Sequence, residues 1–207
     1  MGYVDQILPE VIPAAPGCPD EIARRAIRSA AMEFFRDSQV WRVTITGAAA
    51  IAGFREVSLP IPGGTFVQRV YWVRLSGRDL KGVSERWIGT DEVRGRPTEY
   101  AVPPGSKTLL LNPIPTTNEL SPGLTAHLAL VPGFDTVSIP EDLVERYRMA
   151  LVHGGIRNVL ATPGASWANT RLAGDYAHFF ETAKTQARRA GDADNAPITR
   201  KVRYGGI

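Results

Sequence analysis

Apolar residues recur with helical spacing soon after the start of the chain, in a segment that begins at Pro19. Proline is common in the first turn of a helix, and the carboxylates of Asp20 and Glu21 complement the positive end of the helix dipole. The pattern predicts a helix that runs to about Asp37. The residues that share its apolar face are Ile22, Ala26, Ile27, Ala30 and Phe34.

Residues 1–17 lack this period and contain three prolines, Pro9, Pro13 and Pro16. Because proline restricts its own backbone and that of the preceding residue, we expect an extended lead-in there. The first regular element of the chain is therefore expected at Pro19.

Residues 42–138 have a different pattern, in which proline and glycine separate short β-branched and aromatic runs. Such spacing is typical of a small β-sandwich or barrel. The run over residues 69–75 alternates most clearly, which indicates a half-buried strand. The predicted strands are 42–46, 55–59, 66–75, 85–88, 98–102, 107–111, 124–130 and 136–139.

The helical period returns at Pro140, where Glu141 and Asp142 again occupy a first turn. The helix that follows contains Gly154 and Gly155, although each glycine lowers helix stability by about 1 kcal/mol relative to alanine. We therefore expect the backbone of the Ala-rich first helix to lie close to this pair.

A last helix is predicted after Asn169, a residue type that caps helix N-termini. Arg188 and Arg189 lie near its end, where the helix dipole favours cations. Residues 191–197 are polar and unfavourable to a helix, so we expect the helix to end before them. The apolar stripe comprises Leu172, Tyr176, Phe179, Phe180, Ala183 and Ala187.

The final residues alternate in the manner of a β-strand with one apolar face. The apolar positions are Ile198, Val202 and Tyr204, and the polar ones include Thr199, Lys201 and Arg203. A single strand after a polar spacer has no partner in its own domain, so we expect it to pair with another chain. A frayed, solvated terminus is the alternative.

These patterns divide the chain into four parts. Residues 1–41 form an N-terminal arm and the first bundle helix, and residues 42–138 form an inserted β-domain. Residues 139–190 form a C-terminal helical hairpin that completes the bundle, and residues 191–207 form an extended C-terminal docking arm. The expected fold class is α+β: a helical bundle of one N-terminal and two C-terminal helices, with an inserted small β-sandwich or barrel and an extended C-terminal arm.

The composition is that of a globular protein, because 43% of the 207 residues are hydrophobic and 22% are charged, enough to bury a core. The net charge of +3 argues against a dedicated nucleic-acid-binding protein, whose basic face would be denser. Cys18 is the single cysteine, which excludes an internal disulfide and a cysteine-based metal cluster. Neither a signal peptide nor a membrane span is expected, and no cofactor is indicated.

The segment Gly105-Ser106-Lys107-Thr108 resembles the end of a phosphate-binding loop. That motif needs glycine directly before the lysine and again five residues earlier, where this chain has Ser106 and Ala101. We therefore expect a turn between two strands.

The sequence gives equally little support to the other candidate catalytic or metal-binding groups. Asp175, His178 and Glu181 are three residues apart on the last predicted helix, but one helix seldom completes a metal shell, so a solvated face is favoured. Ser166 lacks a Gly-x-Ser-x-Gly elbow, and Cys18 lacks a base marked by the sequence. We predict no catalytic residue and no metal site.

Several segments, in order along nearly the whole chain, carry a family resemblance. They are Leu8-Pro9-Glu10-Val11, Pro16-Gly17-Cys18-Pro19-Asp20, Ala26-Ile27-Arg28-Ser29-Ala30-Ala31-Met32-Glu33-Phe34-Phe35, Leu111-Asn112-Pro113, Ile139-Pro140-Glu141-Asp142-Leu143, Ala150-Leu151-Val152-His153-Gly154-Gly155 and Pro163-Gly164-Ala165-Ser166-Trp167. With the aromatic final helix, they resemble the head-to-tail adaptor, or connector, proteins of tailed phages, in particular those similar to tail tubular protein A.

The resemblance implies a virion structural protein without enzymatic activity, located in the neck of the particle and assembled in the host cytoplasm. It implies a homo-oligomeric ring, typically of twelve copies, that lies beneath the portal protein and binds a tail or nozzle protein. Double-stranded DNA would pass through the lumen without sequence-specific binding. The small net charge agrees with this, because a strongly basic lumen would slow the DNA through phosphate contacts.

The resemblance also implies that the C-terminal arm reaches the portal. The cations of the arm would meet acidic groups there, which gives register and faster encounter, while Tyr204 and Ile207 would be apolar anchors. The predicted portal-binding residues are Ile198, Arg200, Lys201, Val202, Arg203, Tyr204 and Ile207.

Two alternatives stay open. The protein could be a tail-side component, such as a terminator or a nozzle-associated protein, whose β-domain makes the chief contact. It could also be a small hydrolase in which folding brings a histidine to Ser166 or Cys18.

Overall fold

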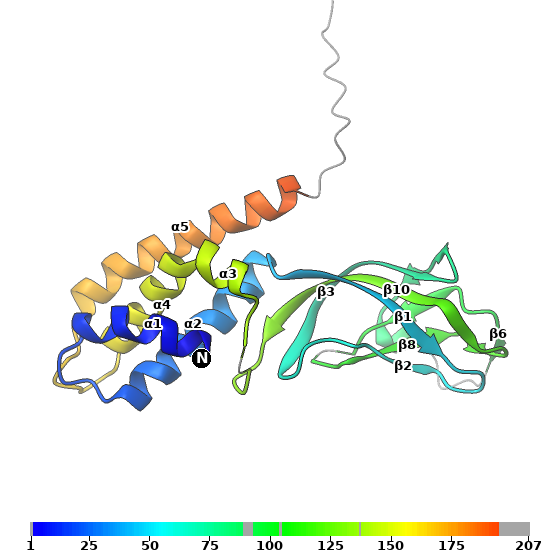
Figure 1. Ribbon diagram of the computed structural model, residues 1–207, viewed down its shortest axis with the longest axis horizontal. Helices are drawn as coiled ribbons and strands as arrows, with labels where there is room; N and C mark the ends of the chain where they lie inside the picture. The colour runs from blue at the N-terminus through cyan, green and yellow to red at the C-terminus, as the bar shows by residue number, and fades with distance from the viewer. Residues whose placement is uncertain (1, 89–92, 104, 137, 195–207) are drawn as a thin grey trace, which may run out of the picture.

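The computed structural model describes residues 2–88, 93–103, 105–136 and 138–194. Its helices gather at one end of an elongated molecule and its strands at the other (Figure 1). The described helices are α1 (Tyr3–Val11), α2 (Asp20–Ser38), α3 (Glu141–Arg146), α4 (Arg148–Leu160) and α5 (Thr170–Asp194). Helices and largely antiparallel sheets occur together, which confirms the predicted α+β class.

The described strands form two larger sheets and one small parallel pair. The first sheet has the order β1 (Arg42–Ala50), β10 (Glu119–Pro132), β3 (Thr65–Leu75) and β4 (Arg78–Asp79). The second has the order β2 (Glu56–Ser58), β8 (Thr108–Asn112), β7 (Glu99–Ala101) and β5 (Lys81–Gly82), and β6 (Arg94–Gly95) pairs with β9 (Ile114–Pro115). Buried side chains from both larger sheets, such as Leu128 and Leu109, belong to one hydrophobic cluster.

The extended lead-in predicted for residues 1–17 is wrong over residues 3–11, which form α1. This helix contains Pro9, yet it buries Tyr3, Ile7 and Val11 along one face. Burial of that stripe outweighs the backbone hydrogen bond lost at the proline, because tertiary packing supplies most of the stability of short helices.

Two of the predicted strands are also wrong. Residues 85–87 form a 3₁₀ turn in which the Ile88 amide donates to the Glu85 carbonyl. Around residue 136 the described residues form no strand, because the Thr136 hydroxyl donates to the Gly64 carbonyl and its amide to that of Gly133. In both segments backbone groups form hydrogen bonds within or across a turn, so these segments do not need the hydrogen bonds of a neighbouring strand.

The last two predicted helices have different boundaries in the structure. The helix expected after Pro140 is divided at Tyr147, where φ is −113°, into α3 and α4. Asn169 accepts a hydrogen bond from the Leu172 amide, which confirms it as the cap of α5. The predicted non-helical spacer at 191–197 is wrong for residues 191–194, which continue α5, and residues 195–197 lie outside the described residues.

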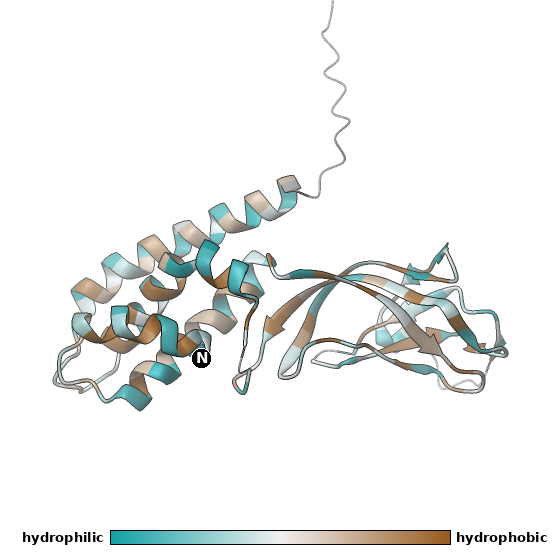
Figure 2. Cartoon of the chain, in the orientation of Figure 1, coloured by the Kyte–Doolittle hydropathy of each residue, from teal (hydrophilic) through white to brown (hydrophobic). Residues whose placement is uncertain are grey.

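The helices pack most closely where the paired glycines of α4 face α2. A Cβ atom at Gly154 would lie 2.8 Å from the Ala30 Cβ and 2.7 Å from the Phe180 ring, and one at Gly155 would meet Ile27 at 3.1 Å. The expected close approach to the Ala-rich helix is therefore confirmed. Figure 2 shows α5 as an alternation of polar and apolar residues, in keeping with its single buried stripe.

A network of charged side chains also joins these three helices. Arg157 of α4 donates to Glu33 of α2 at 2.5 and 3.1 Å, and the buried Lys184 of α5 lies 2.8 Å from Glu33 and 2.9 Å from Asp37. The hydrogen bond from Arg157, opposed by burial and aided by Lys184, lowers the pKa of Glu33 to about 2. Burial alone would lower the pKa of Lys184, but hydrogen bonds to Glu181, Glu33 and Asp37 outweigh it and raise that pKa.

Replacing Gly154 with alanine is expected to destabilise the protein, because the added Cβ atom would clash with Phe180 and Ala30. The clash should outweigh the gain in helix propensity and lower the free energy of unfolding by about 1–3 kcal/mol. Gly174→Ala in α5 is the matched control, since its Cβ would meet no packed neighbour among the described residues, and it should raise stability by up to about 1 kcal/mol. Urea unfolding followed by circular dichroism measures both, and equal effects would contradict the close contact.

Glu33→Gln is expected to change the pH dependence of stability. The pKa of Glu33 is depressed to about 2, so its contribution is complete above the ordinary carboxyl pKa and is lost as the pH falls from about 5 toward 2. At pH 7 the variant should therefore unfold at lower urea concentration than the wild type, and the difference should shrink toward pH 2. The exposed Glu21→Gln serves as control, and a difference that stays constant over this range would exclude the proposed role of the ionised carboxylate.

Candidate functional site

The predicted portal-binding residues, from Ile198 to Ile207, lie outside the described residues. They stay a prediction from the sequence. The part of the chain that leads to them is described up to the end of α5 at Asp194.

The acidic and histidine side chains spaced along α5 are not brought together as a ligand set. Asp175 and His178 line a shallow cavity of about 500 Å³ with Tyr176 and Phe179. Glu181 instead lies 2.7 Å from Lys184, within the charge network of the helices. Across the described residues, no group of three or more His, Cys, Asp or Glu side chains is placed to hold a metal ion.

Of the two candidate nucleophiles, Cys18 has surroundings that do not activate it. Cys18 is buried, and burial raises the pKa of its thiol, the direction opposite to activation. Its Sγ lies 3.5 Å from the Pro19 carbonyl oxygen. Ser166 is exposed in the loop before α5.

Residues 105–108, which resemble the end of a phosphate-binding loop, belong to the turn that leads from β7 into β8. The Ser106 amide donates to the Pro103 carbonyl, and Gly105 has a positive φ of 70°. Ser106 Oγ lies 2.7 Å from Thr108 Oγ1 and accepts from the Thr108 amide, so the side chain closes the turn. The sequence interpretation is confirmed here.

A cleft of about 570 Å³, which no pattern in the sequence predicts, lies between the first sheet and the last described turn of α5. β3 has a β-bulge at Tyr71. Its neighbours Val70 and Trp72 pair with two consecutive residues of β10, Leu128 and His127, so Tyr71 is left without a residue opposite it. The His127 ring then lies 5.2 Å from Tyr71 and 5.9 Å from Trp72, centre to centre. The cleft is lined by Arg42, Thr44, Tyr71, Trp72, His127 and Asp192.

Burial and a neighbouring positive charge favour a neutral histidine in this cleft. His127 Nδ1 lies 2.9 Å from Thr44 Oγ1. Burial, with the nearby charge of Arg42, holds the pKa of His127 below its usual value. The only sequence sign of the cleft was the alternation around residues 69–75, which marks a half-buried strand but not its bulge.

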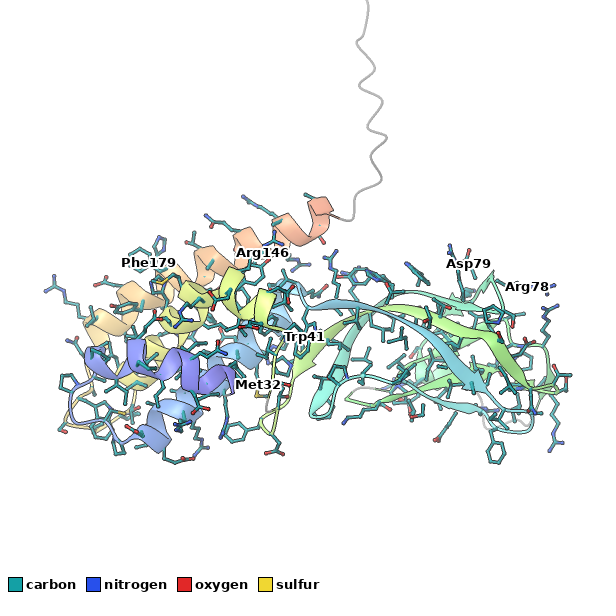
Figure 3. The ribbon with its side chains drawn as sticks, viewed as in Figure 1. Met32, Trp41, Arg78, Asp79, Arg146 and Phe179 are labelled. Atoms are coloured by element: carbon teal, nitrogen blue, oxygen red, sulfur yellow. The ribbon has the colours of Figure 1, made fainter. Side chains whose placement is uncertain are left out.

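Aromatic side chains also gather on the outer side of α4 and α5. The His153 ring lies 5.5 Å from Tyr176 and 5.4 Å from Phe179, centre to centre. Phe179 is 53% exposed, and Met149, one turn before His153, is 57% exposed. Figure 3 shows the Phe179 side chain on the outward side of α5. Exposed apolar surface of this kind is typical of protein–protein contacts rather than of an enclosed active site.

None of the described helices is both long and apolar enough to span a membrane. A comparison with protein-family models matches residues 4–201 to the family described as SU10 adaptor protein. A search of curated proteins finds no match. The family match supports the predicted adaptor resemblance, although it does not extend to the narrower likeness to tail tubular protein A. Because the match covers nearly all of the 207 residues, the chain belongs to the SU10 adaptor protein family.

Proposed function

We propose that the protein is a head-to-tail adaptor of a tailed phage, copies of which form a ring beneath the portal, join the capsid to the tail and continue the DNA channel. The observation that carries the proposal is the family match over residues 4–201. The elongated shape supports it, because a helical end and a β-sheet end offer separate surfaces to two different neighbours (Figure 1).

In this proposal the four parts of the chain have separate tasks. The helices of residues 1–41 and 139–190 form the body of the ring, and the β-domain of residues 42–138 faces the tail. The arm of residues 191–207 binds the portal. α5 is described to Asp194, and the first predicted portal-binding residue, Ile198, follows four positions later in the sequence.

The finer features of the assembly belong to the same proposal. We assign a ring of twelve copies, an arrangement similar to that of tail tubular protein A, and a place in the virion neck after assembly in the host cytoplasm. The role is structural and not catalytic, in keeping with the raised pKa of Cys18. A net charge of +3 suits a lumen through which DNA slides.

A tail-side component is the second candidate, and exposed apolar residues on the β-domain favour it. Phe54 is 65% exposed, Val93 56% and Leu120 56%. Backbone hydrogen bonds connect the segments of Phe54 and Val93 to β9, from the Gly53 amide to the Pro115 carbonyl and from the Ile114 amide to the Val93 carbonyl. Exposed apolar side chains of this kind suit a tail protein as partner.

Deletion of residues 199–207 is expected to leave the protein folded and to abolish its attachment to filled heads, because the portal would lose both cations and apolar anchors. Phage particles produced with the truncated protein should lack tails in electron micrographs. The matched control is Arg188→Glu with Arg189→Glu, which removes two exposed cations of α5 but keeps the arm.

Normally tailed particles from the truncated protein would contradict the portal-binding role of the arm. If Phe54→Asp then abolished tails while the truncation did not, the β-domain would make the chief contact, as in the tail-side alternative. Unchanged circular dichroism of each variant separates loss of binding from loss of folding.

A further inference from the structure

A shallow groove runs between α4 and α5 on the outer side of the helices. It consists of two hollows of about 500 and 470 Å³, the first beside His153 and Phe179 and the second beside Met149 and Ala183. Met149 and His153 are four residues apart in α4, as are Phe179 and Ala183 in α5, so each pair lies on one side of its helix. The two hollows therefore lie in line and form one groove.

The lining of this groove suits another helix. Phe179 and Met149 are more than half exposed, so apolar side chains are open to solvent along both helices. Farther along α5 the lining includes Ala187 and Ala190, whose short side chains leave room for those of a neighbouring helix. A groove of this kind accepts the apolar side chains of a helix at a spacing of three and four residues.

α2 has a ridge with this spacing on the opposite side of the helices. Ile27 packs against Gly155 of α4, and Arg25 and Ser29 lie two positions on either side of Ile27, about 200° around the helix. They therefore point away from α4. The residues of the ridge are Ile22, Arg25, Ser29, Met32 and Arg36, of which four are exposed and Met32 is half-buried.

The ridge and the groove have matching lengths. From Ile22 to Arg36 the ridge spans about 21 Å of helix, and from Leu172 to Ala190 the groove follows α5 for about 27 Å. Ile22, at one end of the ridge, is 36% exposed, so it offers apolar surface to a partner. The whole ridge of one copy can therefore lie within the groove of another.

The charges along the two surfaces are complementary. Arg25 and Arg36 are eleven residues apart on the ridge, or about 16 Å. In the groove, Asp175 lines one hollow, and Glu145 lines the other beside Ala187, which lies twelve residues beyond Asp175, or about 18 Å. Two cations on the ridge thus have the same separation as two carboxylates in the groove.

The ion pairs that these side chains form within one copy do not prevent such a contact. Arg36 lies 3.3 Å from Asp37, and Glu145 lies 3.4 Å from Arg148. Both pairs are exposed, and exposed ion pairs contribute little to stability. Arg36 and Glu145 can therefore turn to a partner at little cost.

We propose that the groove between α4 and α5 binds the α2 ridge of a second copy of this chain. The inference rests on the proposed ring and names the two surfaces that build it. Figure 3 shows Phe179 at the upper edge of the helices and Met32 on their lower side, so groove and ridge face in different directions. Each copy that fills a groove leaves its own groove open for the next copy, and such head-to-tail contacts close into a ring when the rotation between copies allows it.

Photo-crosslinking from position 179 tests the contact in the full chain. p-Benzoylphenylalanine in place of Phe179 keeps an exposed aromatic side chain in the groove. Irradiation of concentrated purified protein and of phage particles should give an adaptor dimer on denaturing gels, with the link located by mass spectrometry in residues 22–36. The same group in place of Phe54, which is exposed on the β-domain, is the control and should not link to α2.

A link from position 179 to another segment of the adaptor or to another protein would overturn the proposal. The absence of an adaptor dimer from both samples would overturn it as well.

Charge reversal tests whether the ridge and the groove meet each other. Arg25→Glu with Arg36→Glu makes the ridge acidic, and Asp175→Arg with Glu145→Arg makes the groove basic. In protein that carries the crosslinking group, each double variant alone should give about tenfold less dimer, because like charges would then face each other. An equal mixture of the two variants should regain the dimer, because each ridge then finds a groove of opposite charge.

Arg78→Glu with Lys81→Glu is the matched control for this reversal. It changes two exposed cations of the β-domain by the same total charge and should leave the dimer yield unchanged. A mixture that gives no more dimer than either double variant alone would contradict the pairing of ridge and groove. Recovery in the mixture also shows that the variants are folded.

Particle assembly separates this inference from the proposed function. If position 179 links to α2 and the acidic-ridge variant gives particles without tails, both are supported. If the link forms but the acidic-ridge particles are normally tailed, the contact between copies stands and the need for a ring in tail attachment fails. If adaptor copies in particles are linked only through other surfaces, the ring stands and this inference fails.

Discussion

The close contact between α2 and α4 is the constraint on which the rest of the structure depends. These helices come from either side of the strand region, and they can meet only because Gly154 and Gly155 leave room for Ala30 and Ile27. The entropy of closing a loop grows slowly with its length, so the large intervening region adds little to the cost of that contact. Once α2 and α4 are in contact, the chain must leave the helices and return to them at neighbouring points. β1 and β10, the strands that do so, pair directly, with Arg42 opposite Ala129.

That pairing also fixes the β-domain relative to the helices. The Leu130 amide donates to the Trp41 carbonyl, and the buried Trp41 ring packs edge-on against Phe35 at 5.7 Å (Figure 3). Residues 39–41 connect α2 to β1 and include the turn at Gln39. Because apolar packing and backbone hydrogen bonds both act on this short connection, it has little conformational freedom. The restrained connection between α2 and β1 keeps the helices and the strands at opposite ends of the elongated molecule.

The elements that the sequence predicted are those whose pattern is local. α2 and most of α5 have a continuous apolar stripe, and residues 69–75 of β3 alternate, so their period could be recognised without knowledge of their partners. α1 could not be predicted in the same way, because Pro9 argues against a helix and only burial against α2 and α4 overrides it. The cleft beside Tyr71 was missed for a similar reason, since a bulge depends on the register with β10.

The end of α5 shows the same limit over a longer distance. Gly191 and Asp192 look unfavourable to a helix, yet they belong to α5, and both accept hydrogen bonds from Arg42, which lies 149 and 150 residues earlier in the sequence. No pattern near residue 191 contains that information. The predicted portal-binding residues differ from this, because their alternation can be seen in the local sequence, whereas the partner that they are expected to bind belongs to another protein.

The distribution of charge separates the cations that hold the fold from those that can act on partners. Arg157 and Lys184 face Glu33, Asp37 and Glu181, so the charges inside the helical body are compensated by near neighbours. In the sequence, Arg200, Lys201 and Arg203 lie close together with no acidic residue among them. At physiological salt, charges act over only about 8 Å, so in the proposed function these cations can orient the arm once it is near the portal but cannot attract it from afar.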